Sequence, residues 1–228
     1  LLVVTFTEKA AQELKTRISN RLLERGSHFN VNEMYLGTFH SICLRILEEY
    51  REFTRLKRSF VLMDQFDQQY FLYQNLREFS EIEGIEFIQG ESKIPAWVKS
   101  ENLLGWLNKA SEEVLDIEQL THSDDVAISG LGAAYTVYQE LLKKHNSLDF
   151  SCIQLETLVL LQEYPQVLEE LTTKITYLMV DEYQDTNAVQ YCLLRGLSLD
   201  HQHLAVTGDP DQAIYGWRGA SIRNILEF

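Results

Sequence analysis

The sequence predicts an α/β fold in which a parallel sheet is interrupted by an inserted, all-helical subdomain. Apolar runs at residues 1–5 and 175–180 are typical of buried strands, and a helical pattern follows each. The stretch from about 60 to 145 is instead rich in Tyr, Phe, Gln and Glu at helical spacing. We therefore expect two halves of one α/β domain, residues 1–57 and 146–228, around a helical subdomain at 58–145.

The first α/β segment has a regular alternation of elements. Residues 1–5 predict a buried strand, and Thr7 is a good N-cap for a helix that runs to about Arg25. Gly26 is expected to end that helix. A second strand is expected to end near Thr38, with a helix beginning at about Ser41.

The inserted segment shows helical periodicity throughout, and no strand alternation is convincing. Its first stripe contains Phe66, Tyr70 and Tyr73, and a short helix is expected after Pro95. A further stripe of Tyr and Leu lies at residues 135–142. These patterns predict a helical bundle.

The last segment returns to the α/β pattern. The run 175–180 is continuously apolar, as in a strand covered on both faces, and it stops at Asp181. A helix containing Val189 and Leu193 is expected next. Residues 204–207 predict one more buried strand, which ends before Gly208.

Charge and cysteine content limit the classes of function. A net charge of −14 argues against nucleic acid, but residues 1–57 carry nine basic and seven acidic residues, a local net charge of +2. Three cysteines, far apart and odd in number, favour a reducing cytoplasm over a disulfide framework or a zinc site. No apolar run approaches the roughly 20 residues that span a bilayer, so we expect no membrane segment.

Polar clusters follow each predicted strand, and residues 181–185 form the most specific one. The carboxyl ends of parallel strands share one edge of a sheet, where such folds bind their ligands. Two adjacent carboxylates after a buried strand, Asp181 and Glu182, suit a magnesium ion with a bound nucleotide. The alternative is an acidic helix N-terminus, and the further presence of Gln184 and Asp185 favours the nucleotide.

A second cluster spans residues 208–220. Tyr215, Trp217 and Arg218 combine two aromatic faces with a cation, which suits stacking on the bases of single-stranded nucleic acid. The alternative is that the aromatic residues belong to the core. The flanking Gly216 and Gly219 favour an exposed loop.

These segments resemble the motifs of the UvrD/Rep/PcrA DNA helicases. Residues 181–185 and 208–220 resemble motifs II and III, residues 4–14 motif Ia, and residues 37–41 motif Ib. Residues 146–150 resemble the stretch where the family's chain returns from its inserted helical domain. The resemblance covers both α/β segments, and it implies a RecA-like P-loop NTPase lobe with ATP and Mg²⁺ as cofactors.

The resemblance also implies roles for individual residues. Asp181 is expected to hold Mg²⁺, Glu182 to polarise the water that attacks the γ-phosphate, and Gln212 to sense that phosphate. The expected contacts with single-stranded DNA are Thr5, Phe6, Thr7, Thr38, His40, Tyr215, Trp217 and Arg218. His40 is equally well explained as a hydrogen-bonded structural histidine.

Three departures from the family's pattern stand out. Glu8 occupies a position where Asn is usual, the insert is strongly acidic, and no G-x-x-x-x-G-K-[ST] phosphate loop is present. We therefore expect an incomplete RecA-like sheet, and a fragment that is inactive alone although the complete protein is an ATP-dependent helicase.

The resemblance implies a translocase that moves 3′ to 5′, works in DNA repair in the cytoplasm, and meets DNA junctions and other helicase or repair proteins. One alternative is the motor of an AddA/RecB-type helicase–nuclease. The other is a non-catalytic interaction module derived from a helicase.

Overall fold

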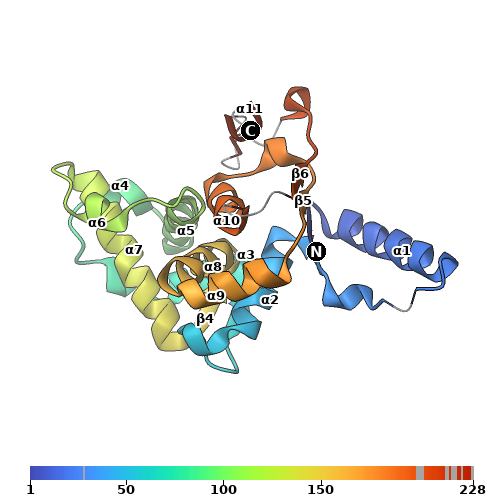
Figure 1. Cartoon of the computed structure of the whole chain (residues 1–228). Coiled ribbons are helices and arrows are strands. Elements are labelled where there is room, and N and C mark those ends of the chain that lie inside the picture. The colour runs from blue at the N-terminus through green and yellow to red at the C-terminus, as the bar shows by residue number, and fades with distance from the viewer. Residues whose placement is uncertain (28, 199–202, 214–215, 217–219, 222, 227–228) are drawn as a thin grey trace. The chain divides into compact units, whose positions relative to one another are not determined.

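The computed structural model describes residues 1–27, 29–198, 203–213, 216, 220–221 and 223–226. The chain divides into two compact units (Figure 1). Unit 1 comprises Leu1–Phe53 and Glu156–Phe228, and unit 2 comprises Thr54–Leu155. These limits differ from the expected limits after residues 57 and 145, because the two strands at the ends of the insert pair with each other and stay in one unit.

Unit 1 is built on a four-stranded parallel sheet with the strand order β2-β1-β5-β6. Its parallel character confirms the predicted α/β class. The strands are β1 (Leu2–Thr5), β2 (Tyr35–Thr38), β5 (Leu178–Val180) and β6 (Leu204–Val206). Because the central strands β1 and β5 come from opposite ends of the sequence, the two α/β segments form one domain.

The register aligns the carboxyl ends of the four strands. Thr5 pairs with Thr38 in β2, and Val4 pairs with Val180 in β5. Val180 in turn pairs with Val206 in β6. The residues that follow these strands therefore lie along one edge of the sheet.

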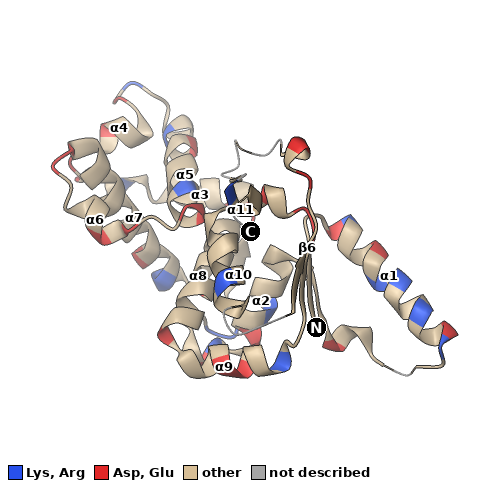
Figure 2. Ribbon diagram, turned by 45° about the horizontal axis from the view of Figure 1, so that its top comes forward, with Lys and Arg blue, Asp and Glu red and all other residues tan. Residues whose placement is uncertain are grey.

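Helices flank this sheet on both faces. In Figures 1 and 2, α1 lies on one face, and α2, α9 and α10 lie on the other. The unit contains α1 (Glu8–Glu24), α2 (Phe39–Glu49), α9 (Pro165–Lys174), α10 (Ala188–Ser198) and α11 (Arg223–Leu226), and the 3₁₀ turns η1 (Val31–Glu33), η2 (Arg51–Phe53), η4 (Tyr183–Asp185) and η5 (Pro210–Gln212). Helix α8 (Phe150–Glu163) begins in unit 2 and ends in unit 1.

The predicted signals at the ends of α1 are confirmed. The Thr7 hydroxyl accepts a hydrogen bond from the Ala10 N–H at 3.2 Å, which caps the helix. At the other end Gly26 has a φ of +68°, a left-handed conformation that glycine adopts without a steric penalty. Helix α2 starts two residues earlier than expected, because Thr38 is its N-cap.

Unit 2 is mostly helical, but it also contains a two-stranded sheet that the all-helical prediction missed. Strand β3 (Val61–Met63) pairs in parallel with β4 (Ser147–Asp149). Each strand has three residues, which is too short for an alternating pattern to be visible in sequence. The remaining elements are α3 (Gln65–Gln74), η3 (Leu76–Phe79), α4 (Ile85–Gln89), α5 (Ala96–Glu112), α6 (Ile117–Thr121) and α7 (Val126–His145).

Two helices of unit 2 differ from the sequence expectation. Helix α5 was expected to be short, but it has 17 residues. Pro95 is its N-cap, a position compatible with the start of a helix. The stripe of Phe66, Tyr70 and Tyr73 on α3 faces outward, and Gln68 and Leu72 are buried in its place. The periodicity predicted the helix correctly, but it did not show which face of the helix is covered.

The two carboxyl-terminal strands are less buried than expected. In β5, Met179 is 44% exposed between the buried Leu178 and Val180, because successive side chains point to opposite faces of a sheet. The residues of β6 are half-buried or exposed, as suits the outermost strand of the described sheet. Among the described residues, no helix is both long and apolar enough to cross a membrane.

Candidate nucleotide site

A row of polar side chains lies at the carboxyl edge of the sheet in unit 1. In sheet order these residues are Thr38, Thr5, Asp181 and Thr207, one from the end of each strand. The Asp181 N–H donates to the Val4 carbonyl at 3.0 Å, which fixes Asp181 beside Thr5. The topology therefore gathers the predicted clusters into one place.

Asp181 is exposed, and its orientation is fixed by two hydrogen bonds. Its Oδ1 accepts the Glu182 N–H at 3.1 Å and also accepts the Thr207 hydroxyl. Thr207 was not among the predicted site residues. Its position, directly after a strand and before Gly208, was the signal that could have identified it.

Glu182 is half-buried and has a left-handed backbone, with φ +52° and ψ +44°. This conformation is uncommon for a residue with a side chain. It turns the chain from β5 into η4, where the backbone N–H of Tyr183 donates to the Thr207 carbonyl at 2.9 Å. The Glu182 Oε2 accepts a hydrogen bond from Gln184 Nε2 at 2.8 Å.

Gln212 is exposed on the neighbouring loop, after β6. Its Nε2 donates to Asp209 Oδ2 at 2.7 Å, while Asp209 Oδ1 accepts the Asp211 N–H at 3.0 Å. The same Asp209 donates its own N–H to Gln184 Oε1 at 3.0 Å. Through these contacts the structure connects the two predicted clusters.

Asp185 is buried, and its carboxyl group is only partly satisfied. Oδ2 is 3.4 Å from Gln184 Nε2, whereas Oδ1 has no hydrogen-bond partner among the described residues. Burial, and then the nearby Glu182 carboxylate, raises the pKa of Asp185. Asp185 belongs to this candidate site because it contacts Gln184, which also holds Glu182.

The threonines at this edge have structural hydrogen bonds. Thr5 Oγ1 donates to the Thr7 carbonyl at 3.2 Å, and Thr38 Oγ1 donates to Glu8 Oε1 at 2.7 Å. Glu8, which departs from the family's usual Asn, therefore links α1 to the start of α2. Thr5 and Thr38 are buried, while Thr7 is exposed and Phe6 is half-buried.

His40 lies in the first turn of α2 and is half-buried. Burial lowers its pKa, and the nearby Glu8 opposes this effect. The side chain is therefore mostly neutral at pH 7, so a contact with DNA would use hydrogen bonding or stacking and not charge. The remaining predicted DNA contacts, Tyr215, Trp217 and Arg218, lie outside the described residues.

The donor set at Asp181 suits a hard divalent cation. Mg²⁺ prefers oxygen ligands and is commonly held by one or two carboxylates together with substrate phosphates. Asp181 and Glu182 supply carboxylates, and Thr207 adds a hydroxyl. The described residues contain no cluster of three or more His, Cys, Asp or Glu that could hold a metal ion. Two carboxylates from the protein leave coordination positions that a phosphate ligand could fill.

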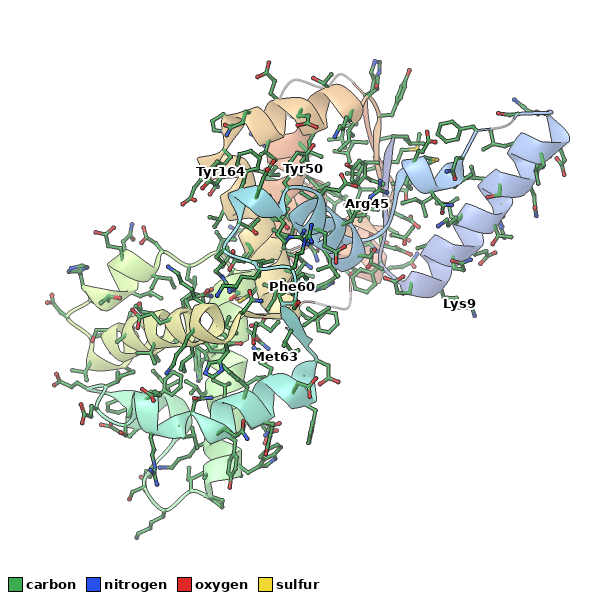
Figure 3. The ribbon with its side chains drawn as sticks, turned by 90° about the horizontal axis from the view of Figure 1, so that it is seen from below. Lys9, Arg45, Tyr50, Phe60, Met63 and Tyr164 are labelled. Atoms are coloured by element: carbon green, nitrogen blue, oxygen red, sulfur yellow. The ribbon has the colours of Figure 1, made fainter. Side chains whose placement is uncertain are left out.

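A pocket of about 770 Å³ lies at the start of β1 and β2, the opposite end of the sheet. It includes Arg45 and Tyr50, which Figure 3 labels. Its cations Arg45 and Lys174 are each paired with a glutamate, at 2.7 Å and 2.6 Å. With two further glutamates in its lining, the described pocket has no surplus positive charge to attract a phosphate.

Comparisons with known proteins find relatives that match the whole length of the chain. The model of the UvrD/REP helicase N-terminal domain family matches residues 1–228. The ATP-dependent DNA helicase PcrA of Bacillus subtilis (strain 168) is 36% identical over 233 residues, covering 100% of this chain and 29% of that protein. PcrA of Staphylococcus aureus (strain Mu50 / ATCC 700699) is 37% identical over 230 residues, with the same coverage. The chain thus spans less than a third of the length of these relatives.

Proposed function

The chain belongs to the UvrD/REP helicase N-terminal domain family, and from this premise we propose that it forms part of the motor of an ATP-dependent DNA helicase. The relatives that match its whole length are named as ATP-dependent DNA helicases. The complete protein would couple ATP hydrolysis to movement along single-stranded DNA, in the 3′ to 5′ direction. It would act in the cytoplasm, on DNA junctions and with other repair proteins.

The observation that supports this proposal most is the joint position of Asp181, Glu182 and the Gln212 loop. They follow the adjacent strands β5 and β6, and Thr207 and Gln184 connect them by hydrogen bonds. Phosphoryl transfer needs a metal ligand, a group that orients water and a contact with the γ-phosphate, all close together. This edge offers a candidate for each requirement.

Each residue has a distinct proposed role. Asp181 holds Mg²⁺, which when bound would neutralise phosphate charge. The Glu182 Oε1, which has no hydrogen-bond partner among the described residues, accepts a proton from water, while Oε2 stays bonded to Gln184. Gln212 contacts the γ-phosphate by exchanging its bond to Asp209 for one to the substrate.

The proposed DNA track runs along the same edge of the sheet. It includes Thr5, Phe6, Thr7, Thr38 and His40, with Tyr215, Trp217 and Arg218, which follow Gln212 in the sequence. Aromatic side chains on such a track stack on bases, each worth about 1–3 kcal/mol. The exposed Thr7 and the half-buried Phe6 and His40 support this placement best.

The test is ATP hydrolysis by the complete protein, with and without single-stranded DNA. We expect strong stimulation by DNA, and we expect Glu182→Gln to lower kcat by at least about 100-fold, since general-base catalysis contributes that much or more. Glu163→Gln is the matched control, because Glu163 is an exposed carboxylate at the end of α8. Undiminished turnover by Glu182→Gln would remove the proposed role of this residue, and an absence of DNA-stimulated hydrolysis would refute the motor function.

A further inference from the structure

Gln184 occupies the centre of the candidate site, although neither its sequence motif nor the proposed chemistry gives it a task. Its side chain is almost fully buried, with 1% of its surface exposed. Nε2 donates to Glu182 Oε2 at 2.8 Å and approaches Asp185 Oδ2 at 3.4 Å. Oε1 accepts the Asp209 N–H at 3.0 Å. One amide group therefore contacts both loops.

These contacts specify an amide in one orientation. The end that faces Glu182 and Asp185 must donate, because both partners are carboxylates, and the end that faces Asp209 must accept. A glutamate at this position would place a third carboxylate beside those of Glu182 and Asp185, and a hydrocarbon would satisfy neither side. The chemistry of the site thus selects glutamine.

Gly208 permits the close approach of the two loops. A Cβ atom at position 208 would lie 2.5 Å from Gln184 Oε1 and 2.8 Å from Ile225 Cδ1. Contacts this short require the Gln184 and Ile225 side chains to shift, so a side chain at 208 would displace the Gln184 amide. The observed geometry of the bond between Gln184 and Asp209 therefore depends on this glycine.

The connection continues to the residue proposed to contact the γ-phosphate. Asp209 donates its N–H to Gln184, and its Oδ2 accepts from Gln212 Nε2 at 2.7 Å. The hydrogen-bonded series therefore runs from Glu182 through Gln184 and Asp209 to Gln212. Its two ends are the proposed base and the proposed phosphate sensor.

We propose that Gln184 is a positioning residue that transmits the position of the Gln212 loop to the Glu182 carboxylate. This inference rests on the proposed function. When Gln212 leaves Asp209 for a phosphate, the Asp209 backbone is released to shift, and the Gln184 amide follows its N–H. Glu182 Oε2 then moves with the amide, so the orientation of the base depends on the state of the loop.

The main test is Gln184→Met in the complete protein, which keeps the length of the side chain and removes both hydrogen bonds. We expect kcat to fall about 10- to 100-fold, as for a misplaced catalytic group, while KM for ATP changes less than about twofold. Stimulation by DNA should fall as well. Gln190→Met is the matched control, because Gln190 is also buried and its Oε1 accepts the Asn187 N–H at the start of α10.

A second variant alters the contact between Gln184 and Asp209 at the exposed residue Gly208. Gly208→Ala should lower kcat and DNA stimulation in the same way, with little change in melting temperature. The effect of Gln184→Met should also be smaller in a Gln212→Ala background than in the wild type, because both changes interrupt one series.

Three results would overturn the inference. They are normal kcat and DNA stimulation in both variants, additive effects of Gln184→Met and Gln212→Ala, or equal losses in Gln190→Met. If Glu182→Gln abolishes turnover in the same assays, the proposed function survives such a result and only the role of Gln184 is lost. If Glu182→Gln retains turnover, the proposed role of Glu182 fails with it, and if DNA does not stimulate hydrolysis by the wild type, the proposed function itself fails.

Discussion

Glu182 combines a carboxylate, here proposed to act as a base, with a backbone conformation that usually costs about 1–3 kcal/mol for a residue other than glycine. Its surroundings offset this cost. The Asp185 N–H donates to the Glu182 carbonyl at 2.9 Å, and Gln184 holds the side chain. A glycine would relieve the strain, but it would remove the carboxylate. Strain retained at this position is consistent with a functional role.

Asp185→Asn should stabilise the chain at neutral pH. The raised pKa means that folded Asp185 binds its proton more tightly than the unfolded chain does. Stability from this proton is present below the ordinary carboxyl value of 3.8 and is lost as pH rises through the raised value. We expect the variant to be more stable by about 1 kcal/mol at pH 7, a typical cost of a buried unpaired acceptor. The advantage should vanish in acid.

Thermal melts of the nucleotide-free chain between pH 3 and 7 would measure this difference. Glu163→Gln again serves as the control, since it changes an exposed carboxylate of the same unit. A variant that is less stable than the wild type at pH 7 would show that the buried Asp185 carboxylate does not lower the stability of the fold.

At the level of secondary structure, Asp149 joins the elements of unit 2 through a buried network. It is fully buried at the end of β4, where Oδ2 accepts the Tyr138 hydroxyl at 2.5 Å and Oδ1 accepts the Cys152 N–H at 2.8 Å. The Tyr138 hydroxyl accepts from Gln68, whose Nε2 also donates to Asn108. The network thus connects α3, α5, α7 and the first turn of α8.

Asp149→Ala should destabilise unit 2 by about 2–4 kcal/mol, because it removes a helix cap and leaves buried donors unpaired. Asp64→Ala is the control. It removes the cap of α3, where Asp64 accepts the Asp67 N–H at 2.8 Å in an exposed position, and should cost about 1 kcal/mol. Chemical denaturation would compare the two variants. Equal losses would show that the buried network adds nothing beyond a cap.

The strands and helices differ in how far the sequence alone could predict them. The polar residues after each strand were predictable, because parallel strands bring their carboxyl ends together whatever their order. The three-residue β3 and the outward-facing Phe66 were not, since short strands lack a period and a helical stripe does not reveal which face is covered. The contact of Gln184 with Asp209 depends on the approach of Gly208, which only the tertiary structure shows.

For the whole chain, two compact units predict two unfolding transitions. Each unit has its own buried core, with Leu47 and Leu171 in unit 1 and Leu72 and Leu142 in unit 2. Trp97 and Trp106 lie in unit 2, so the tryptophan fluorescence of a Trp217→Phe variant reports on that unit. We expect calorimetry to detect both transitions and fluorescence to follow one of them. A single transition common to both methods would contradict this expectation.

The pairing of β1 with β5 also has a consequence for the order of folding. Residues 2–4 pair with residues 178–180, so the central pair of the sheet can form only after the entire insert has left the ribosome. Contacts within the insert close shorter loops than the pairing of β1 with β5 and should form earlier, because closing so long a loop is slow. The pairing of β3 with β4 draws the two ends of the insert together and shortens the effective loop. Biosynthesis would then produce a folded insert first and the carboxyl edge of the sheet last.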